Sequence, residues 1–392
     1  MAEKMISHEE IKKQLAIVIL AFADYESLEL SLATHAKFSV DAGVPIFILQ
    51  NGRGTYDNER TLSVAQRYQS LFPEHIKVIT HIPPQKPYAA LSRLFDDKLF
   101  SGYHYIIKLD DDVMVLTEDW IDKLIDCYIY GCESAGEDLA YVTSLVNNNP
   151  YGFKKLIDSC PELSSDYYAN KARAHLIGFH PDYGMIPYRI VPKETVFGGG
   201  FGTIWQLPYL ARWLHEKTTM QPEHYISLAS AFGIEEVDSR ERYSINCMLF
   251  HKTLWKAIDN GIPDDEGNLH EYCFFRNKKI FADFSIPMVH IAFYTQREEV
   301  RDMIPAIREV YERFLSLNFP IAICSNKMIE IENRLRFMEQ MGRGQLSNGR
   351  KSPWLFRKIR GGILCYKEHG FRYTVHRTFE HLTGKAREEK QQ

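Results

Sequence analysis

The first quarter of the chain alternates short apolar runs with segments of helical spacing. The run LAIVILAF at residues 15–22 has no polar alternation, and further apolar runs occupy residues 44–51, 75–82 and 105–109. Apolar runs without alternation are typical of strands buried on both faces of a parallel sheet. The segments between them, at residues 25–42, 58–71 and 89–100, have the spacing of helices. This alternation predicts βαβ units and an α/β fold with a doubly wound, mostly parallel sheet that is covered by helices on both faces.

Composition excludes several classes of protein. The 392 residues are 45% hydrophobic and 25% charged, with a net charge of −4, which argues against bulk binding to nucleic acid. The seven cysteines form no C-x-x-C pair and are expected to be reduced thiols of a cytoplasmic protein. The charged N-terminus lacks the apolar core of a signal peptide, and the apolar run at residues 15–23 is about half of the ~20 residues that a membrane-spanning helix needs.

The rest of the chain is expected to continue the fold and then to change character. A strand is expected at residues 139–146, and the long segment 147–189 has no clear periodicity, which favours an active-site loop or lid. Residues 300–340 have helical spacing. The predicted parts are a catalytic domain at 1–300 (halves 12–112 and 113–300), a helical segment at 301–345 and a basic amphipathic segment at 346–392.

Three adjacent aspartates, Asp110, Asp111 and Asp112, follow the fourth apolar run. Adjacent carboxylates repel one another unless water or a cation offsets their charge. Residues i and i+2 of an extended chain point the same way, so Asp110 and Asp112 are expected to share a face and Asp111 to point elsewhere. Ligands of such sheets bind beyond the carboxyl ends of the strands, and two oxygens on one face suit Mg²⁺ or Mn²⁺. The alternative is a solvated turn between a strand and a helix.

The segment YIIKLDDDVMV at residues 105–115 resembles the D-x-D segment of the GT-A glycosyltransferases that use nucleotide sugars, in particular the family-2-like bacterial enzymes of polysaccharide synthesis. The resemblance extends, in the order and spacing of elements, over residues 12–300. It implies a Rossmann-like GT-A fold, a nucleotide-sugar donor, and a divalent cation, Mn²⁺ or Mg²⁺, beneath the diphosphate. By this resemblance Asp110 approaches the ribose or the metal, Asp112 ligates the metal, and Asp111 belongs to the donor site.

The same resemblance suggests further residues of the donor site. Lys86 and Arg93 stand where the family often contacts the nucleotide, and a diphosphate favours a cationic partner. Their alternative interpretation is a solvated helix face. Asn51 and Asp57 are the candidates for contact with the base.

A glycine-rich segment and a second acidic cluster form another candidate constellation. By the resemblance it comprises a loop for the donor sugar and acceptor and two catalytic carboxylates: Gly198, Gly199, Gly200, Glu235, Glu236, Asp238 and Arg242. Glu236 occupies the place of the base that takes the proton of the acceptor hydroxyl, which implies inversion at the anomeric carbon. Glycines allow close backbone approach to a ligand. The alternative for EEVD is an acidic cluster at the start of a helix.

His290 ends an apolar run near the end of the predicted catalytic domain. A histidine in such a run is more often a core residue than a ligand. The family resemblance implies that it completes the metal site, and imidazole is an acceptable ligand of Mn²⁺.

The resemblance therefore implies an inverting, metal-dependent glycosyltransferase that moves a sugar from a nucleotide sugar, expected to be a UDP-sugar, to a glycan or a lipid-linked acceptor. The alternatives are a retaining enzyme of the same fold, a sugar-phosphate nucleotidylyltransferase and a non-catalytic glycan-binding subunit. Basic and bulky apolar residues interleave over residues 350–387, which suits an anionic membrane surface on the cytoplasmic side. An ordinary helical cap on the catalytic domain explains the same pattern, and no nucleic-acid-binding motif accompanies the charge.

Overall fold

A computed structural model of the chain describes residues 7–174, 178–180, 184–186, 208–239, 243–261, 264–291 and 297–321. The chain divides into two compact units, residues 1–323 and 324–392, and every described residue belongs to the first. The domain boundaries expected at residues 300 and 345 therefore stay predictions. No helix among the described residues is long and apolar enough to cross a membrane.

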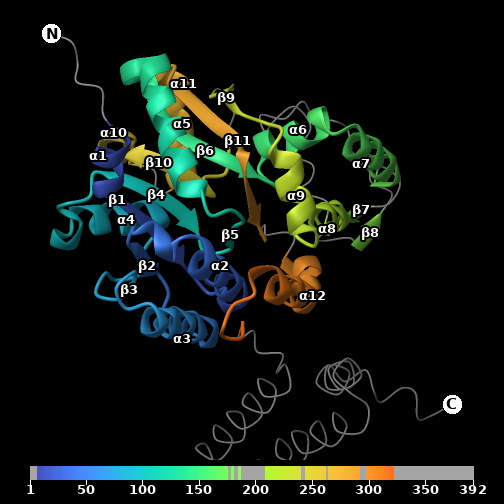
Figure 1. Cartoon of the computed structure of the whole chain (residues 1–392), viewed down its shortest axis with the longest axis horizontal. Coiled ribbons are helices and arrows are strands. Elements are labelled where there is room, and N and C mark those ends of the chain that lie inside the picture. The colour runs from blue at the N-terminus through green and yellow to red at the C-terminus, as the bar shows by residue number, and fades with distance from the viewer. Residues whose placement is uncertain are drawn as a thin grey trace, which may run out of the picture. The chain divides into compact units, whose positions relative to one another are not determined.

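The first unit is a mixed α/β structure that begins with the expected βαβ repeats (Figure 1). After α1 (His8–Lys13), the successive elements are β1 (Leu15–Ala21), α2 (Tyr25–Phe38), β2 (Ile46–Gln50), α3 (Tyr56–Leu71), β3 (Ile76–Ile79), α4 (Pro87–Asp96) and β4 (Tyr105–Asp110). The four strands are parallel in the order β3-β2-β1-β4, and every residue of β2 is buried. The four apolar runs thus form the strands that the sequence predicts.

The rest of the unit extends this sheet to nine strands. Its described elements are β5 (Val113–Val115), α5 (Trp120–Ala135), β6 (Leu139–Val146), α6 (Pro150–Ser159), α7 (Pro161–Ala174), β7 (Gly178–His180), β8 (Gly184–Ile186), α8 (Pro208–Lys217), α9 (Pro222–Ala229), β9 (Ile234–Val237), β10 (Cys247–His251), α10 (Thr253–Ala257), α11 (Asp265–Arg276), β11 (Lys279–His290) and α12 (Arg297–Leu315). β10 is antiparallel to both β4 and β6, and β11 is parallel to β6. β4, β6 and β11 therefore run in the same direction and have their carboxyl ends at one edge.

The expectation of a long irregular loop over residues 147–189 is wrong for most of that segment. Residues 150–159 and 161–174 form α6 and α7, which pack against each other. Each helix begins with a proline, a residue whose fixed φ suits the first helical turn. Because both helices follow directly on β6 and one on the other, no long loop is left between residues 147 and 174.

The order of the strands reverses between β1 and β4. The chain passes from β1 outward to β2 and β3, and then returns to place β4 on the other side of β1. Leu20 of β1 pairs with Asp110 of β4, so the carboxyl ends of both strands lie at the same level. Doubly wound sheets bind their ligands beyond the carboxyl ends of the strands at such a reversal.

Two strands, β9 and β5, pair with the same edge of β11 near its opposite ends (Figure 1). β9 pairs with residues 280–283, and β5 pairs with residues 288–290, beyond an irregularity between Asp283 and Pro287. β5 follows β4 after only two residues, Asp111 and Asp112. The sheet therefore curls, and the pairing of His290 with Val113 brings the end of β11 to the end of β4.

Gly152 allows α6 to start close to the end of β6. A Cβ at this position would lie 2.1 Å from the carbonyl oxygen of Val146, the last residue of β6. That distance is far shorter than any normal contact and involves backbone, so α6 would have to move away. Residues 147–149, which connect β6 to α6, would move with it.

We expect Gly152→Ala to lower the free energy of unfolding by about 1–3 kcal/mol, because the added methyl group overpacks the β6–α6 junction. Urea unfolding followed by circular dichroism measures the change. Gly233→Ala is the matched control, since a Cβ there meets no atom within 4 Å. Equal unfolding midpoints for the two variants would contradict the close approach at Gly152.

Candidate functional site

Asp110, Asp112 and His290 converge beyond the carboxyl end of β4. One possible ligand atom from each residue lies within 4.8 Å of those from the other two. Oδ1 of Asp112 and Nε2 of His290 are 3.0 Å apart, and the two side chains are only 8% and 5% exposed. Burial alone lowers the pKa of His290, but Asp112 outweighs it and raises that pKa above its ordinary value. Two carboxylates and one imidazole that face a common point fit a divalent cation such as Mn²⁺ or Mg²⁺.

A buried lysine lies beneath Asp110. The Lys108 side chain is 2% exposed, and its ammonium pairs with Asp110 and donates to the carbonyl of Ile245 at 2.9 Å. Burial lowers the pKa of Lys108, but Asp110 and Asp265 reverse the effect, so the net shift is upward. Burial raises the pKa of Asp265 at the start of α11. Lys108 thus neutralises charge at the floor of the site.

A chain of polar side chains continues from the other oxygen of Asp110. Asn246 Nδ2 donates to Asp110 Oδ2 at 3.2 Å and to Ser244 Oγ at 3.0 Å. Ser244 Oγ in turn donates to Glu266 Oε1 at 2.9 Å. Burial raises the pKa of Glu266, although the bond from Ser244 opposes the shift. Both oxygens of Asp110 therefore have a donor that fixes the carboxylate.

Asp111 has a different partner from its neighbours. Its Oδ2 accepts the backbone N–H of Phe22 at 2.7 Å, just beyond the end of β1. The next residue, Ala23, has a φ of 54°, a conformation that non-glycine residues seldom adopt. Burial of the carboxyl group, followed by the charges of Asp112 and Asp24, raises the pKa of Asp111. Asp111 therefore holds the loop from β1 to α2, and it is not one of the three residues of the metal-ligand cluster.

Of the four remaining candidates for the donor site, three lie at the same edge of the sheet and Arg93 does not. Asn51, just beyond β2, bonds the backbone of Gln85 through both ends of its amide, at 2.8 and 3.1 Å. Asp57 lies in the first turn of α3. Lys86 is the exposed N-cap of α4, at the carboxyl edge, whereas Arg93 lies in the last turn of that helix, about 10 Å further from the edge.

The second acidic cluster is not brought to Asp110, Asp112 and His290. Glu235 and Glu236 lie on the edge strand β9, where Glu236 binds Lys279 at 2.6 Å and Glu235 binds Lys155. Lys279 is the first residue of the twelve-residue strand β11, and His290 is its last. Asp238 is exposed, and it lines a cavity of ≈ 430 Å³ together with Glu236 and Lys279. Gly198, Gly199, Gly200 and Arg242 lie outside the described residues.

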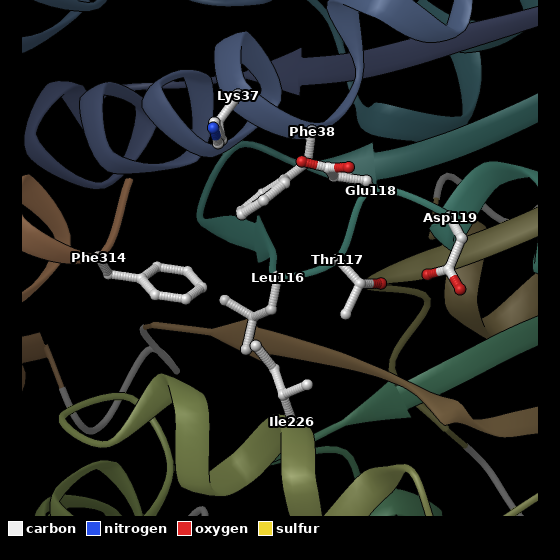
Figure 2. A pocket seen from close by; sticks show the side chains of 8 residues that line it. All are labelled: Lys37, Phe38, Leu116, Thr117, Glu118, Asp119, Ile226 and Phe314. Carbon is white, nitrogen blue, oxygen red and sulfur yellow. The ribbon is translucent and has the colours of Figure 1, made fainter. Parts of the chain in front are cut away.

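A separate pocket of ≈ 510 Å³ opens at the far end of β5. Apolar side chains from four segments converge on it, with charged groups at its rim (Figure 2): Lys37, Phe38, Leu116, Thr117, Glu118, Asp119, Ile226 and Phe314. Leu116 follows β5 while Asp112 precedes it, a separation of roughly 13 Å along an extended strand. The pocket contains none of the residues that the sequence singled out.

Sequence interpretation missed the buried amides that surround the ligands. Asn147, Asn148 and Asn149 follow β6, and all three are at most 1% exposed. Asn246 is completely buried. The signal was present as the run NNNP directly after an apolar strand, since polar residues at the carboxyl end of such a strand lie at the ligand-binding edge.

Among known proteins, only solved structures resemble this chain. No model of a known protein family matches the sequence, and no curated protein matches it. Among solved structures, a mannosyltransferase from Pyrobaculum calidifontis, in complex with GDP-mannose and Mn²⁺, is similar with a TM-score of 0.39 and 9% identity, over 94% of this chain and 87% of the other. A likeness at this TM-score indicates nothing about function.

We expect Lys108→Met to destabilise the protein by about 3–5 kcal/mol, because it leaves Asp110, Asp265 and Glu266 without their buried cation. Urea unfolding at neutral pH measures the loss. Lys77→Met on β3 is the control, since Lys77 is exposed. An unchanged midpoint for Lys108→Met would show that the lysine is not needed to balance the carboxylates.

Proposed function

We propose that this chain is a divalent-metal-dependent glycosyltransferase that uses a nucleotide sugar. The observation that carries the proposal is the convergence of Asp110, Asp112 and His290 within 4.8 Å at the reversal of strand order. The ligand set suits a hard divalent cation, and the carboxyl edge at a reversal of strand order is where doubly wound sheets bind their ligands.

The residues of the site have separable roles in this proposal. Asp110, Asp112 and His290 would hold the cation, which supplies positive charge against the diphosphate that leaves the sugar. Lys86, at the N-terminus of α4, stands at the same edge and offers a further charge to the diphosphate. Asn51 and Asp57 follow β2 at this edge and are proposed to face the nucleoside.

The proposal assigns neither the base nor the stereochemistry of transfer. A base must lie within hydrogen-bond reach of the hydroxyl whose proton it takes. Glu236 pairs with Lys279 at the opposite end of β11 from His290, so the proposal does not give it this role. Inversion at the anomeric carbon depends on Glu236 as the base. Without that role for Glu236, the proposal covers inverting and retaining transfer alike.

The finer parts of the proposal rest on the sequence resemblance. They are a UDP-sugar as the donor, a glycan or lipid-linked acceptor, the family-2-like type, and a membrane surface as partner of residues 350–387, which lie outside the described residues. The buried ligand cluster favours an enzyme over a non-catalytic glycan-binding subunit, because buried carboxylates without a function for their charge are costly.

The test is release of nucleoside diphosphate from a panel of UDP-, GDP- and other nucleotide sugars, with and without Mn²⁺. We expect release from at least one donor, dependent on the metal, and a loss in Asp112→Asn and His290→Ala that exceeds the roughly 10–100-fold effect of outer-shell changes. Asp126→Asn on α5, an exposed carboxylate, is the matched control.

Two results would contradict the proposal. One is equal release by Asp112→Asn and by the unaltered protein. The other is release from an active donor at the same rate after the divalent cations have been removed by a chelator.

A further inference from the structure

The three buried asparagines after β6 sit between the two sides of the metal-ligand cluster. β6 lies between β10 and β11 in the sheet. Its carboxyl end therefore has Asn246, just before β10, on one side and His290, the last residue of β11, on the other. A buried amide is costly without partners, so the bonds that each asparagine makes identify what it is held against.

Asn148 makes two hydrogen bonds to His290. Its Nδ2 donates to the backbone carbonyl of His290 at 2.9 Å, and its Oδ1 lies 2.9 Å from His290 Nδ1. A carbonyl can only accept, so the first bond fixes the orientation of the amide and directs its oxygen to the ring. Nδ1 of His290 must therefore carry a proton.

The proton on Nδ1 determines what the other ring nitrogen of His290, Nε2, presents to its neighbours. With Nδ1 protonated, the neutral form of His290 has its lone pair on Nε2, the atom that faces Asp112 Oδ1 at 3.0 Å. Metal-ligating histidines donate their other N–H in this way, and the donation fixes both the tautomer and the orientation of the ring. Asn147 holds the backbone of both residues, since its Oδ1 accepts the backbone N–H of His290 at 3.0 Å and that of Asn148 at 2.9 Å.

Asn149 reaches the opposite side of the cluster through Asn246. Asn149 Nδ2 donates to Asn246 Oδ1 at 2.8 Å, which leaves Nδ2 of Asn246 to face Asp110 Oδ2 at 3.2 Å. Because the side-chain oxygen of Asn246 accepts from Asn149, the amino group of Asn246 must be the end that donates to Asp110. Adjacent residues thus fix two ligands that come from different strands.

We propose that Asn148 and Asn149 are positioning residues of the metal site. Asn148 holds His290 in the tautomer that presents Nε2, and Asn149, acting through Asn246, aims the carboxylate of Asp110. The inference rests on the proposed function only in that the cluster binds a divalent cation; it does not depend on the sugar, the nucleotide or the acceptor.

The experiment measures binding of Mn²⁺ alone to the full chain by titration calorimetry or by the paramagnetic resonance of free Mn²⁺. We expect Asn148→Ala to weaken binding about 10–100-fold, the usual effect of removing an outer-shell partner. In a His290→Ala background the same change should weaken binding by less than ~2-fold, because Asn148 acts through the missing ring.

The second arm repeats the cycle on the other side. Asn149→Ala should weaken Mn²⁺ binding in the otherwise unaltered chain and have little further effect in an Asp110→Ala background. Combined with His290→Ala, by contrast, its effect should persist, since the two act on different ligands. This crossed pattern separates two specific contacts from a general loosening of the site.

Asn58→Ala is the matched control, because Asn58 is also buried and its amide donates to Thr55 within the first turn of α3. It should leave the affinity for Mn²⁺ unchanged. If Asn148→Ala does not give folded protein, Asn148→Ser, which fills more of the site, carries the same cycle.

The outcomes distinguish the two proposals. Mn²⁺ binding that requires Asp112 but is unaffected by Asn148→Ala, or that is weakened equally with and without His290, overturns the positioning role alone. Absence of Mn²⁺ binding to the unaltered protein, or binding that survives Asp112→Asn and His290→Ala, overturns the metal site and with it the proposed function.

Discussion

Three adjacent carboxylates at the end of one buried strand are the constraint on which the rest of the site depends. The structure gives each a different partner: Asp110 pairs with Lys108, Asp111 binds the backbone of Phe22, and Asp112 faces His290. Like charges on neighbouring residues are tolerated because each carboxylate has a partner of its own. The fold around β4 supplies these partners: the backbone just beyond β1, the last residue of β11, and a lysine of β4 itself.

The partners come together through one long-range pairing. His290 reaches Asp112 because the end of β11 pairs with β5, although β10 and β6 lie between β11 and β4 in the sheet. Around this meeting point the polar side chains are bonded to one another, from the half-buried Glu266 and Ser244 through the buried Asn246 to Asp110. Networks of this kind hold ligand atoms in place before a ligand arrives, which is what a metal site requires.

The sequence predicts the local parts of this arrangement well. The apolar runs that form β1, β2 and β4 need only burial on both faces to be recognised, and the position of the aspartates follows from the end of β4. It fails where a contact depends on distant segments. Nothing in the neighbourhood of Glu236 reveals that β9 pairs with the start of β11. The apolar residues Phe153, Leu156 and Ile157 of α6 do have helical spacing, so this helix could have been predicted from the sequence, whereas α7 has no comparably clear pattern. The bonds of Asn148 and Asn149 likewise depend on strands more than ninety residues away along the chain.

We propose that Asp110, Asp112 and His290 form one cation site. The most direct measurement is anomalous diffraction at the manganese edge from crystals grown with Mn²⁺ and a nucleoside diphosphate. We expect an anomalous peak at coordination distance from a carboxylate oxygen of Asp110, one of Asp112 and Nε2 of His290, with Asn148 still bonded to Nδ1. An anomalous map with no peak among these three side chains, and with Asp112 still paired directly to His290, would contradict it.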